Sequence, residues 1–268
     1  MDNPFNIASQ LILGLVSGIL TVPLISSFIY LYKRFRTRHL RKFWKPFIGQ
    51  RLAIILNEYL VNVDNQFEGT VQEAVGVGGF LISRGNALAL SNLLNFIPDN
   101  ITKGHNLIVG GDKSGIPNFE NLIILGSPVN HLYAQNVFSS LAERFTIPYE
   151  VVFNSSTETI TIKSKDGIRE YLPKIIGGNG VDYALIIRAR YRNYPSGYAI
   201  ILAGAYMFGT QAASCAITNR EIMNKVCKLS KKAENFAFLI RANVINNQPG
   251  DPELEFGNEI FVHVLEPQ

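Results

Sequence analysis

Charged residues are scarce in this chain of 268 residues, and so are cysteines. Lys, Arg, Asp and Glu together make up 17% of the sequence, whereas about a quarter is usual for a soluble globular domain. Hydrophobic residues make up 47%, which excludes a disordered chain and fits the presence of a membrane segment. The two cysteines, Cys215 and Cys227, show no CxxC spacing. They exclude a disulfide-rich scaffold and a zinc framework, and they fit a reducing compartment.

Catalytic motifs are also missing. Gly126-Ser127 does not fit the G-x-S-x-G pattern of a nucleophile elbow, and no turn fits G-x-G-x-x-G or a P-loop. The four histidines are scattered along the chain, and no carboxylate pair or metal-ligand spacing stands out. Asp112 and Asp182 are interpreted as turn or cap residues. We therefore predict no catalytic residue, no metal site and no cofactor, and we do not expect an enzyme.

Charge is absent from one long segment near the N-terminus. Residues 3–32 contain no charged side chain. About 20 apolar residues span a bilayer as a helix, which satisfies its own backbone hydrogen bonds. We predict a short outer N-terminus over 1–7 and a retained transmembrane helix over 8–32. The length of the run and the basic residues after it disfavour a cleaved signal peptide, and the lack of a polar face disfavours a buried core helix.

Positive charge gathers directly after this run. Residues 1–51 contain eight of the 25 Lys and Arg residues but only one of the 21 Asp and Glu residues. The positive-inside rule then places the following domain in the cytoplasm, so that the chain is a single-pass protein of the cell membrane. A chain-wide nucleic-acid footprint is not supported, because the rest of the chain is slightly acidic.

Residues 33–47 form the predicted basic juxtamembrane segment. Its charges exceed what topology alone needs, so we expect the segment to contact anionic lipid as a helix. The alternative is that the charges only set the topology, which holds better for Lys33 and Arg34 than for the later residues. The expected lipid-binding residues are Arg36, Arg38, Arg41, Lys42 and Lys45. Three aromatic residues, Phe43, Trp44 and Phe47, are expected to accompany them at the membrane surface. Within the transmembrane helix, Gly14 and Gly18 form a GxxxG pair that would favour helix association.

The pattern changes at about residue 48. Short β-branched runs predict strands, several of them continuous and therefore buried on both faces. The predicted strands cover residues 51–56, 78–83, 106–111, 121–127, 159–164, 183–189, 198–205, 236–245 and 259–265. Amphipathic patterns predict helices over 85–97, 130–145 and 210–229. We therefore predict one α/β domain over 48–268, with an open, mostly parallel or mixed sheet, flanking helices and an antiparallel C-terminal part.

Two strand-to-helix turns could bind a small ligand. In open α/β sheets ligands lie at the carboxyl ends of strands, where helix N-termini offer free N–H groups to anions. The residues that would line a phosphate-like or nucleotide-like site are Gly126, Ser127, Asn130, Gly204, Gly209 and Thr210. Ser127, Asn130 and Thr210 are candidate helix caps. The alternative is that these residue types only meet the needs of tight turns.

Three stretches together carry the predicted transmembrane helix with its basic segment and the two strand-to-helix turns: "LILGLVSGILTVPLISSFIYLYKRFRTRHLRKFWKPF", "ENLIILGSPVN" and "YAIILAGAYMFGTQAA". In this order of transmembrane helix, basic segment and α/β domain, the chain resembles the transmembrane effectors encoded beside prokaryotic Argonautes. The resemblance implies abortive antiviral immunity, in which a nucleic-acid-guided Argonaute complex docks on the cytoplasmic domain. The effector then oligomerises and disrupts or depolarises the membrane, with its basic residues on anionic phospholipid and no sequence-specific nucleic-acid contact of its own.

Two other functions remain open at this point. The chain could be a membrane-anchored receptor or enzyme for a nucleotide-like ligand at the two strand-to-helix turns. It could also be a structural anchor that only tethers a partner.

Overall fold

A computed structural model shows a mixed α/β fold. It describes residues 27, 38–56, 74–77, 80–101, 105–109, 121–128, 132–143, 145–146, 150–154, 159–164, 167–192, 197–230, 233–255, 262–264 and 266–267. The predicted transmembrane helix, with Gly14 and Gly18, lies outside these residues apart from Ser27, and Arg36 and Asn130 also lie outside them. Within the described part of the chain, no helix has the length and apolar character needed to cross a membrane.

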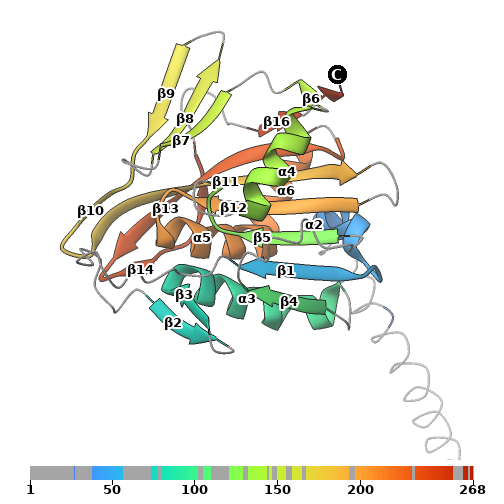
Figure 1. Cartoon of the computed structure of the whole chain (residues 1–268), viewed down its shortest axis with the longest axis horizontal. Coiled ribbons are helices and arrows are strands. Elements are labelled where there is room, and N and C mark those ends of the chain that lie inside the picture. Colours follow the sequence, from blue (N-terminus) through green and yellow to red (C-terminus); the bar gives the residue numbers. More distant parts are fainter. Residues whose placement is uncertain are drawn as a thin grey trace, which may run out of the picture.

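One mixed sheet forms the centre of the fold, with strand order β14-β13-β11-β12-β5-β1-β4 (Figure 1). These strands are β1 (Leu52–Leu56), β4 (His105–Val109), β5 (Asn121–Leu125), β11 (Asn179–Arg192), β12 (Gly197–Gly204), β13 (Phe236–Ile245) and β14 (Gln248–Pro249). Strands β1, β4, β5 and β12 are parallel, whereas β11 and β13 run antiparallel to their neighbours. The predicted mixed sheet and the antiparallel pairing near the C-terminus are therefore confirmed.

Shorter strands extend this sheet or form small sheets beside it. The strands β10 (Lys174–Ile176), β15 (Glu253–Leu254) and β16 (Val262–Val264) pair with β11 or β13. A three-stranded sheet contains β7 (Glu150–Asn154), β8 (Thr159–Ser164) and β9 (Gly167–Tyr171). Two strand pairs join β2 (Ala74–Val77) to β3 (Phe80–Ser83) and β6 (Phe145–Thr146) to β17 (Glu266–Pro267).

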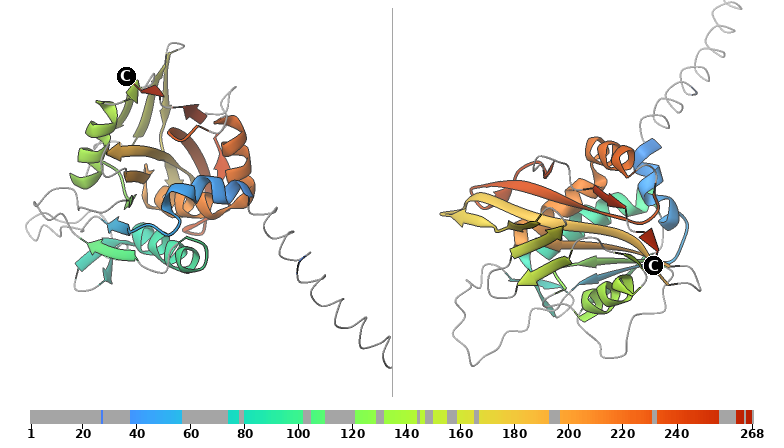
Figure 2. Two further views of the ribbon diagram at one scale, coloured as in Figure 1. Left: turned by 90° about the vertical axis from the view of Figure 1, so that its right-hand side faces the viewer. Right: turned by 90° about the horizontal axis from the view of Figure 1, so that it is seen from above.

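Helices cover both faces of the central sheet (Figure 2). The helices are α2 (Arg38–Trp44), the 3-10 turn η1 (Lys45–Phe47), α3 (Arg84–Asn100), α4 (Leu132–Ala142), α5 (Met207–Thr218) and α6 (Arg220–Leu229). One core cluster joins the sheet to α2, α3, α5 and α6, and the second joins the opposite face to α4 and β8. Because both faces are covered, β1, β5 and β12 are buried at every residue, as their continuous apolar runs predict.

Two of the three predicted helices are confirmed as α3 and α4. The prediction of one helix over 210–229 is wrong, because Asn219 separates α5 from α6. Asn219 has extended backbone angles, and its side-chain oxygen accepts hydrogen bonds from the N–H groups of Glu221 and Ile222. This is the N-cap position that Asn favours, so the residue starts a new helix instead of continuing the old one.

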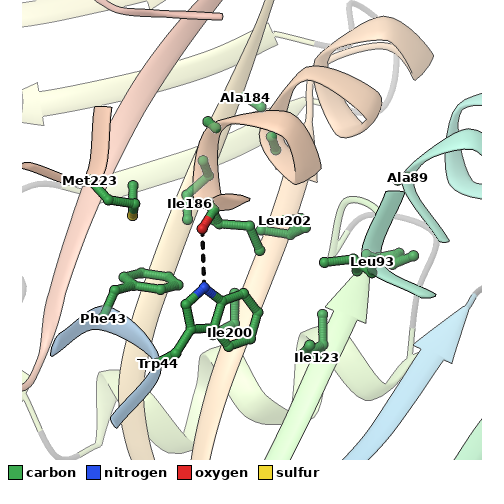
Figure 3. Close-up of a cluster of buried hydrophobic side chains, with 14 of the residues drawn as sticks. Phe43, Trp44, Ala89, Leu93, Ile123, Ala184, Ile186, Ile200, Leu202 and Met223 are labelled. Carbon is green, nitrogen blue, oxygen red and sulfur yellow. Dashed lines mark hydrogen bonds between the residues drawn. The ribbon is translucent and has the colours of Figure 1, made fainter. Parts of the chain in front are cut away.

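The basic segment belongs partly to the folded core. Leu40, Phe43, Trp44 and Phe47 follow the i, i+3, i+4, i+7 spacing of a helix face, and all four are buried. Figure 3 shows Phe43 and Trp44 packed beside residues of β11, β12 and α3. The Trp44 indole N–H donates to the carbonyl oxygen of Ile217 on α5 at 3.1 Å.

The expectation that Phe43, Trp44 and Phe47 lie at the membrane surface is therefore wrong. Each of these side chains has no exposed surface, because it fills space between α2, α6 and the sheet. The hydrophobic core consequently begins at least as early as Leu40, inside the segment that the sequence assigns to the juxtamembrane region.

Removal of the Trp44 ring should detach α2 from the core. We expect Trp44→Ala to lower the free energy of unfolding by about 3–5 kcal/mol, because a large cavity opens in the cluster. Trp44→Phe should cost less, about 1–3 kcal/mol, from a smaller cavity and the lost hydrogen bond to Ile217. Urea denaturation of the full chain in detergent, followed by circular dichroism, measures both.

A matched control for these variants is Ile48→Ala, since Ile48 lies close by on the surface with 42% of its area exposed. This change should alter stability by no more than about 0.5 kcal/mol. Equal unfolding midpoints for the wild type and Trp44→Ala would contradict the packing of α2.

Candidate functional site

A buried carboxylate holds the N-terminus of α5. Asp182 on β11 has no exposed surface, and its side chain accepts hydrogen bonds from the backbone N–H groups of Tyr206 (3.1 Å) and Gly209. A third bond comes from the N–H of Tyr183 at 2.7 Å. The first N–H groups of a helix lack acceptors within the helix, and its dipole favours negative charge there. Asp182 is thus a cap residue, as predicted, and it stands where an anionic ligand would bind.

In the turn that joins β12 to α5, close packing explains why Gly204 and Gly209 are glycines. A Cβ atom at Gly209 would overlap with the Tyr183 carbonyl oxygen, and one at Gly204 would overlap with the backbone of Thr210. Thr210 is buried inside the helix, which begins at Met207 with Tyr206 as its N-cap residue. The prediction that Thr210 caps the helix is therefore wrong. Gly204, Gly209 and Thr210 lie together because the backbone is closely packed there.

The turn after β5, which contains Gly126 and Ser127, lies beside the turn after β12 at the same edge of the sheet. Gly126 follows the last residue of β5, and its N–H donates to the carbonyl oxygen of Leu202 on β12 at 3.0 Å. Its φ angle of 118° lies in the region that favours glycine. Gly126 is buried and Ser127 is half-buried. The adjacent placement expected for Gly126 and Gly204 is present, but the amide of Gly126 is used within the sheet.

The basic residues of the segment differ in their surroundings. Lys45 is exposed and available to a surface ligand, whereas Lys42 is half-buried. Lys42 lies near the thiol of Cys227 on α6, and its charge opposes the rise in the pKa of Cys227 that burial causes. Arg38 and Arg41 belong to α2. Lys45 therefore has the exposure expected of a lipid contact, and Lys42 is tied to the domain.

A buried arginine lies beneath α2. Arg188 on β11 is 4% exposed, and its guanidinium carbon lies 5.6 Å, 5.7 Å and 5.3 Å from the ring centres of Phe43, Tyr198 and Phe236. Its Nε atom has no hydrogen-bond partner within the described residues, and burial lowers the pKa of the guanidinium. The three rings offer the favourable electrostatic contact that a carboxylate would otherwise supply. Because Phe43 belongs to α2, this helix covers the buried charge.

Tyr198 connects the buried arginine to the surface. Its ring also lies 5.3 Å from the guanidinium carbon of Arg190, and its hydroxyl accepts a hydrogen bond from Arg190 at 3.1 Å. The same hydroxyl donates to Glu234 at 2.7 Å, and Glu234 lies 3.7 Å from Arg190. Burial raises the pKa of the Tyr198 hydroxyl. Arg190 thus lies directly beside Glu234, whereas Arg188 feels that carboxylate only from farther away and lies against aromatic rings.

The sequence interpretation missed the roles of Arg188 and Trp44. The sequence does contain a signal for each residue. Arg188 interrupts the apolar run of a buried strand, and Trp44 lies at helical spacing from Leu40 and Phe47. Among the described residues, no group of three His, Cys, Asp or Glu side chains lies close enough to hold a metal ion. No protein-family model and no curated protein sequence matches this chain.

Loss of the Asp182 carboxylate should destabilise α5. Asp182→Ala leaves the amides of Tyr206 and Gly209 without their acceptor, so we expect the free energy of unfolding to fall by about 3–5 kcal/mol. Asp251→Ala, which changes an exposed carboxylate, should have little effect. Added phosphate should raise the melting temperature of Asp182→Ala more than that of the wild type, as it enters the vacated position. A phosphate-induced shift of equal size in both proteins would count against this role of Asp182.

The charge of Arg188 should matter less to stability than its volume. Arg188→Met removes a buried charge but keeps a flexible side chain, so stability should stay within about 1 kcal/mol of the wild type or rise. Arg188→Ala leaves a cavity and should cost about 2–4 kcal/mol. Denaturation curves of the two variants give the comparison. Equal losses would show that the guanidinium contacts, and not the packing, hold α2 in place.

Proposed function

We propose that the chain is a membrane-anchored antiviral effector without catalytic activity. A nucleic-acid-guided complex of the Argonaute type engages its α/β domain in the cytoplasm. The chain then oligomerises, and its N-terminal apolar segment disrupts or depolarises the cell membrane while the basic juxtamembrane residues contact anionic lipid. The support from the sequence is the uncharged run over residues 3–32 and the cluster of positive charge that follows it.

The observation that carries the proposal is the burial of α2 in the domain. A flexible tether after a membrane anchor would leave the domain free to move independently of the anchor. Here Phe43, Trp44 and Phe47 pack into the core within a few residues of the basic run. A change in the position of the domain therefore moves α2 with it.

Helix α5 supplies a path for such a change. Its N-terminus is held by Asp182 at the carboxyl end of the parallel strands, and Ile217 near its C-terminus accepts the hydrogen bond from Trp44. The helix has 12 residues, a length of about 18 Å. A partner that shifts the sheet edge near Asp182 would thus act on α2 through one rigid element.

The alternative function, a receptor or enzyme for a nucleotide-like ligand, has weaker support. Such a site needs free N–H groups at the helix N-terminus. At α5 these groups face the buried carboxylate of Asp182, which would repel a phosphate. A structural anchor alone would not need a buried link between α2 and α5.

Neutralisation of the juxtamembrane charges tests the lipid contact. The variant changes Arg38, Arg41 and Lys45 to Gln. It keeps Lys42, which is half-buried, and Lys33, Arg34 and Arg36, which retain the topology. We expect the full chain to lose its toxicity on induced expression together with the activating complex, because each charge adds about 1 kcal/mol of attraction to anionic lipid. Flotation with anionic vesicles should show the same loss, and neutral phosphatidylcholine vesicles serve as the reference.

The matched control changes Arg220, Lys225 and Lys228 on α6 to Gln, which removes the same charge from another exposed surface. This control should remain toxic, and membrane fractionation should find both variants inserted. Unchanged toxicity and vesicle binding of the juxtamembrane variant would rule out the lipid contact.

A further inference from the structure

The most exposed large apolar side chains of the described residues lie on a few neighbouring strands. They are Ile176 (73% exposed), Ile168 (64%), Ile245 (62%) and Leu172 (55%). Three of them lie along β9 and β10, and Ile245 ends the neighbouring strand β13. Several exposed apolar side chains along one edge are typical of an interaction surface.

These strands also present an open edge. Strands β9 and β10 follow each other with only Leu172 and Pro173 between them, and Figure 1 shows them in yellow along one side of the molecule. Within the described part of the chain, β9 pairs only with β8, and β10 pairs only with β11. An edge that is long, exposed and apolar is a template for another strand.

Exposed and half-buried side chains alternate along this edge from Glu170 to Ile176. Ile168, Glu170, Leu172, Lys174 and Ile176 are all exposed. Between them, Tyr171, Pro173 and Ile175 are half-buried, whereas Arg169 is exposed. The Tyr171 ring packs against Tyr183 with centres 5.4 Å apart. A period of two places the five exposed residues on one face of the edge.

These five side chains form a self-complementary pattern. When two copies of the edge run antiparallel about a two-fold axis at Leu172, each Ile168 faces Ile176 of the other copy. Each Glu170 then faces Lys174 of the other copy, and the two Leu172 side chains meet at the axis. Opposite charges and apolar pairs directly across an antiparallel ladder stabilise it, whereas like charges destabilise it. The two-fold axis makes every contact occur twice, as in an isologous dimer.

We propose that this edge binds the same edge of a second copy of the chain. In the dimer β9 of one copy lies against β10 of the other, so that the three-stranded sheet of each copy joins the central sheet of its partner. Charge complementarity between Glu170 and Lys174 selects this occupant over an unrelated strand. The proposal does not depend on the function proposed above.

The edge is already ordered within a single copy of the chain. The turn between β10 and β11 is tied to the turn between β13 and β14, because the N–H of Asn247 donates to the carbonyl oxygen of Gly178 at 2.8 Å. A second bond joins the N–H of Asn246 to the side-chain oxygen of Asn179 at 3.1 Å. These bonds hold the end of β10 in position, which lowers the cost of ordering it on association.

A charge-reversal series tests the pairing in the full chain in detergent. Glu170→Lys and Lys174→Glu each replace two attractive pairs by two like-charge pairs, so each should weaken self-association about tenfold. The double variant Glu170→Lys/Lys174→Glu restores every pair and should associate like the wild type. A mixture of the two single variants should form a heterodimer, because Lys then faces Glu at each position. Unaltered circular dichroism would show that these surface changes leave the fold intact.

The position of the axis is read out by cross-linking. Leu172→Cys places two thiols beside each other, so mild oxidation should give a disulfide-linked dimer on a non-reducing gel. Leu229→Cys on α6 is the control, since Leu229 is also an exposed apolar residue, at 41%, but lies elsewhere. Adding Glu170→Lys to the Leu172→Cys chain should reduce the cross-link about tenfold, and adding Lys174→Glu as well should restore it.

Three outcomes would overturn the proposal. The first is a cross-link at Leu172→Cys no stronger than at Leu229→Cys. The second is a double charge reversal that associates as weakly as the single variants. The third is a chain that stays monomeric by light scattering until another protein is added, which would assign the edge to a different partner.

Discussion

The rest of the structure depends on how α5 is held at its two ends. At one end the carboxylate of Asp182 accepts the N–H groups of Tyr206 and Gly209, and at the other the indole of Trp44 donates to Ile217. Between these points the helix packs against β11, β12, β13 and α3. Because the bonds are buried, losing either one leaves a polar group without water or a partner. Helix α5 therefore links the carboxyl edge of the sheet to α2.

This arrangement gives the basic segment a second role beside the one proposed at the lipid. An amphipathic helix has one face for each task, and the buried face of α2 carries Leu40, Phe43 and Trp44. Phe43 also covers the charge of Arg188, so the site beneath α2 is closed by the segment that leads toward the apolar run. The proposed effector function uses this continuity, since no flexible linker separates the domain from α2.

The central sheet ends in two different ways. Strand β4 closes one end of the strand order, and at the other end β10 and β14 accompany the long strands β11 and β13, away from α2 (Figure 1). The β9–β10 edge carries apolar side chains that are otherwise rare on the described surface. Self-association through this edge would leave α2 uncovered. The proposed dimer contact and the proposed membrane contact are therefore compatible in one assembly.

Local patterns in the sequence determined the fold class, the continuous buried strands and helices α3 and α4. Hydrophobic periodicity acts over a few residues and needs no knowledge of the partner. The break at Asn219 is also local, because its side chain caps α6. The membrane-surface expectation for Trp44 and the cap at Thr210 were overturned by tertiary structure. A hydrogen-bond acceptor such as Asp182 lies 27 residues from Gly209, and Ile217 lies 173 residues from Trp44. The same aromatic face of α2 satisfies a lipid surface or a protein core, and only the presence of Arg188, Phe236 and α5 beside it selects the core.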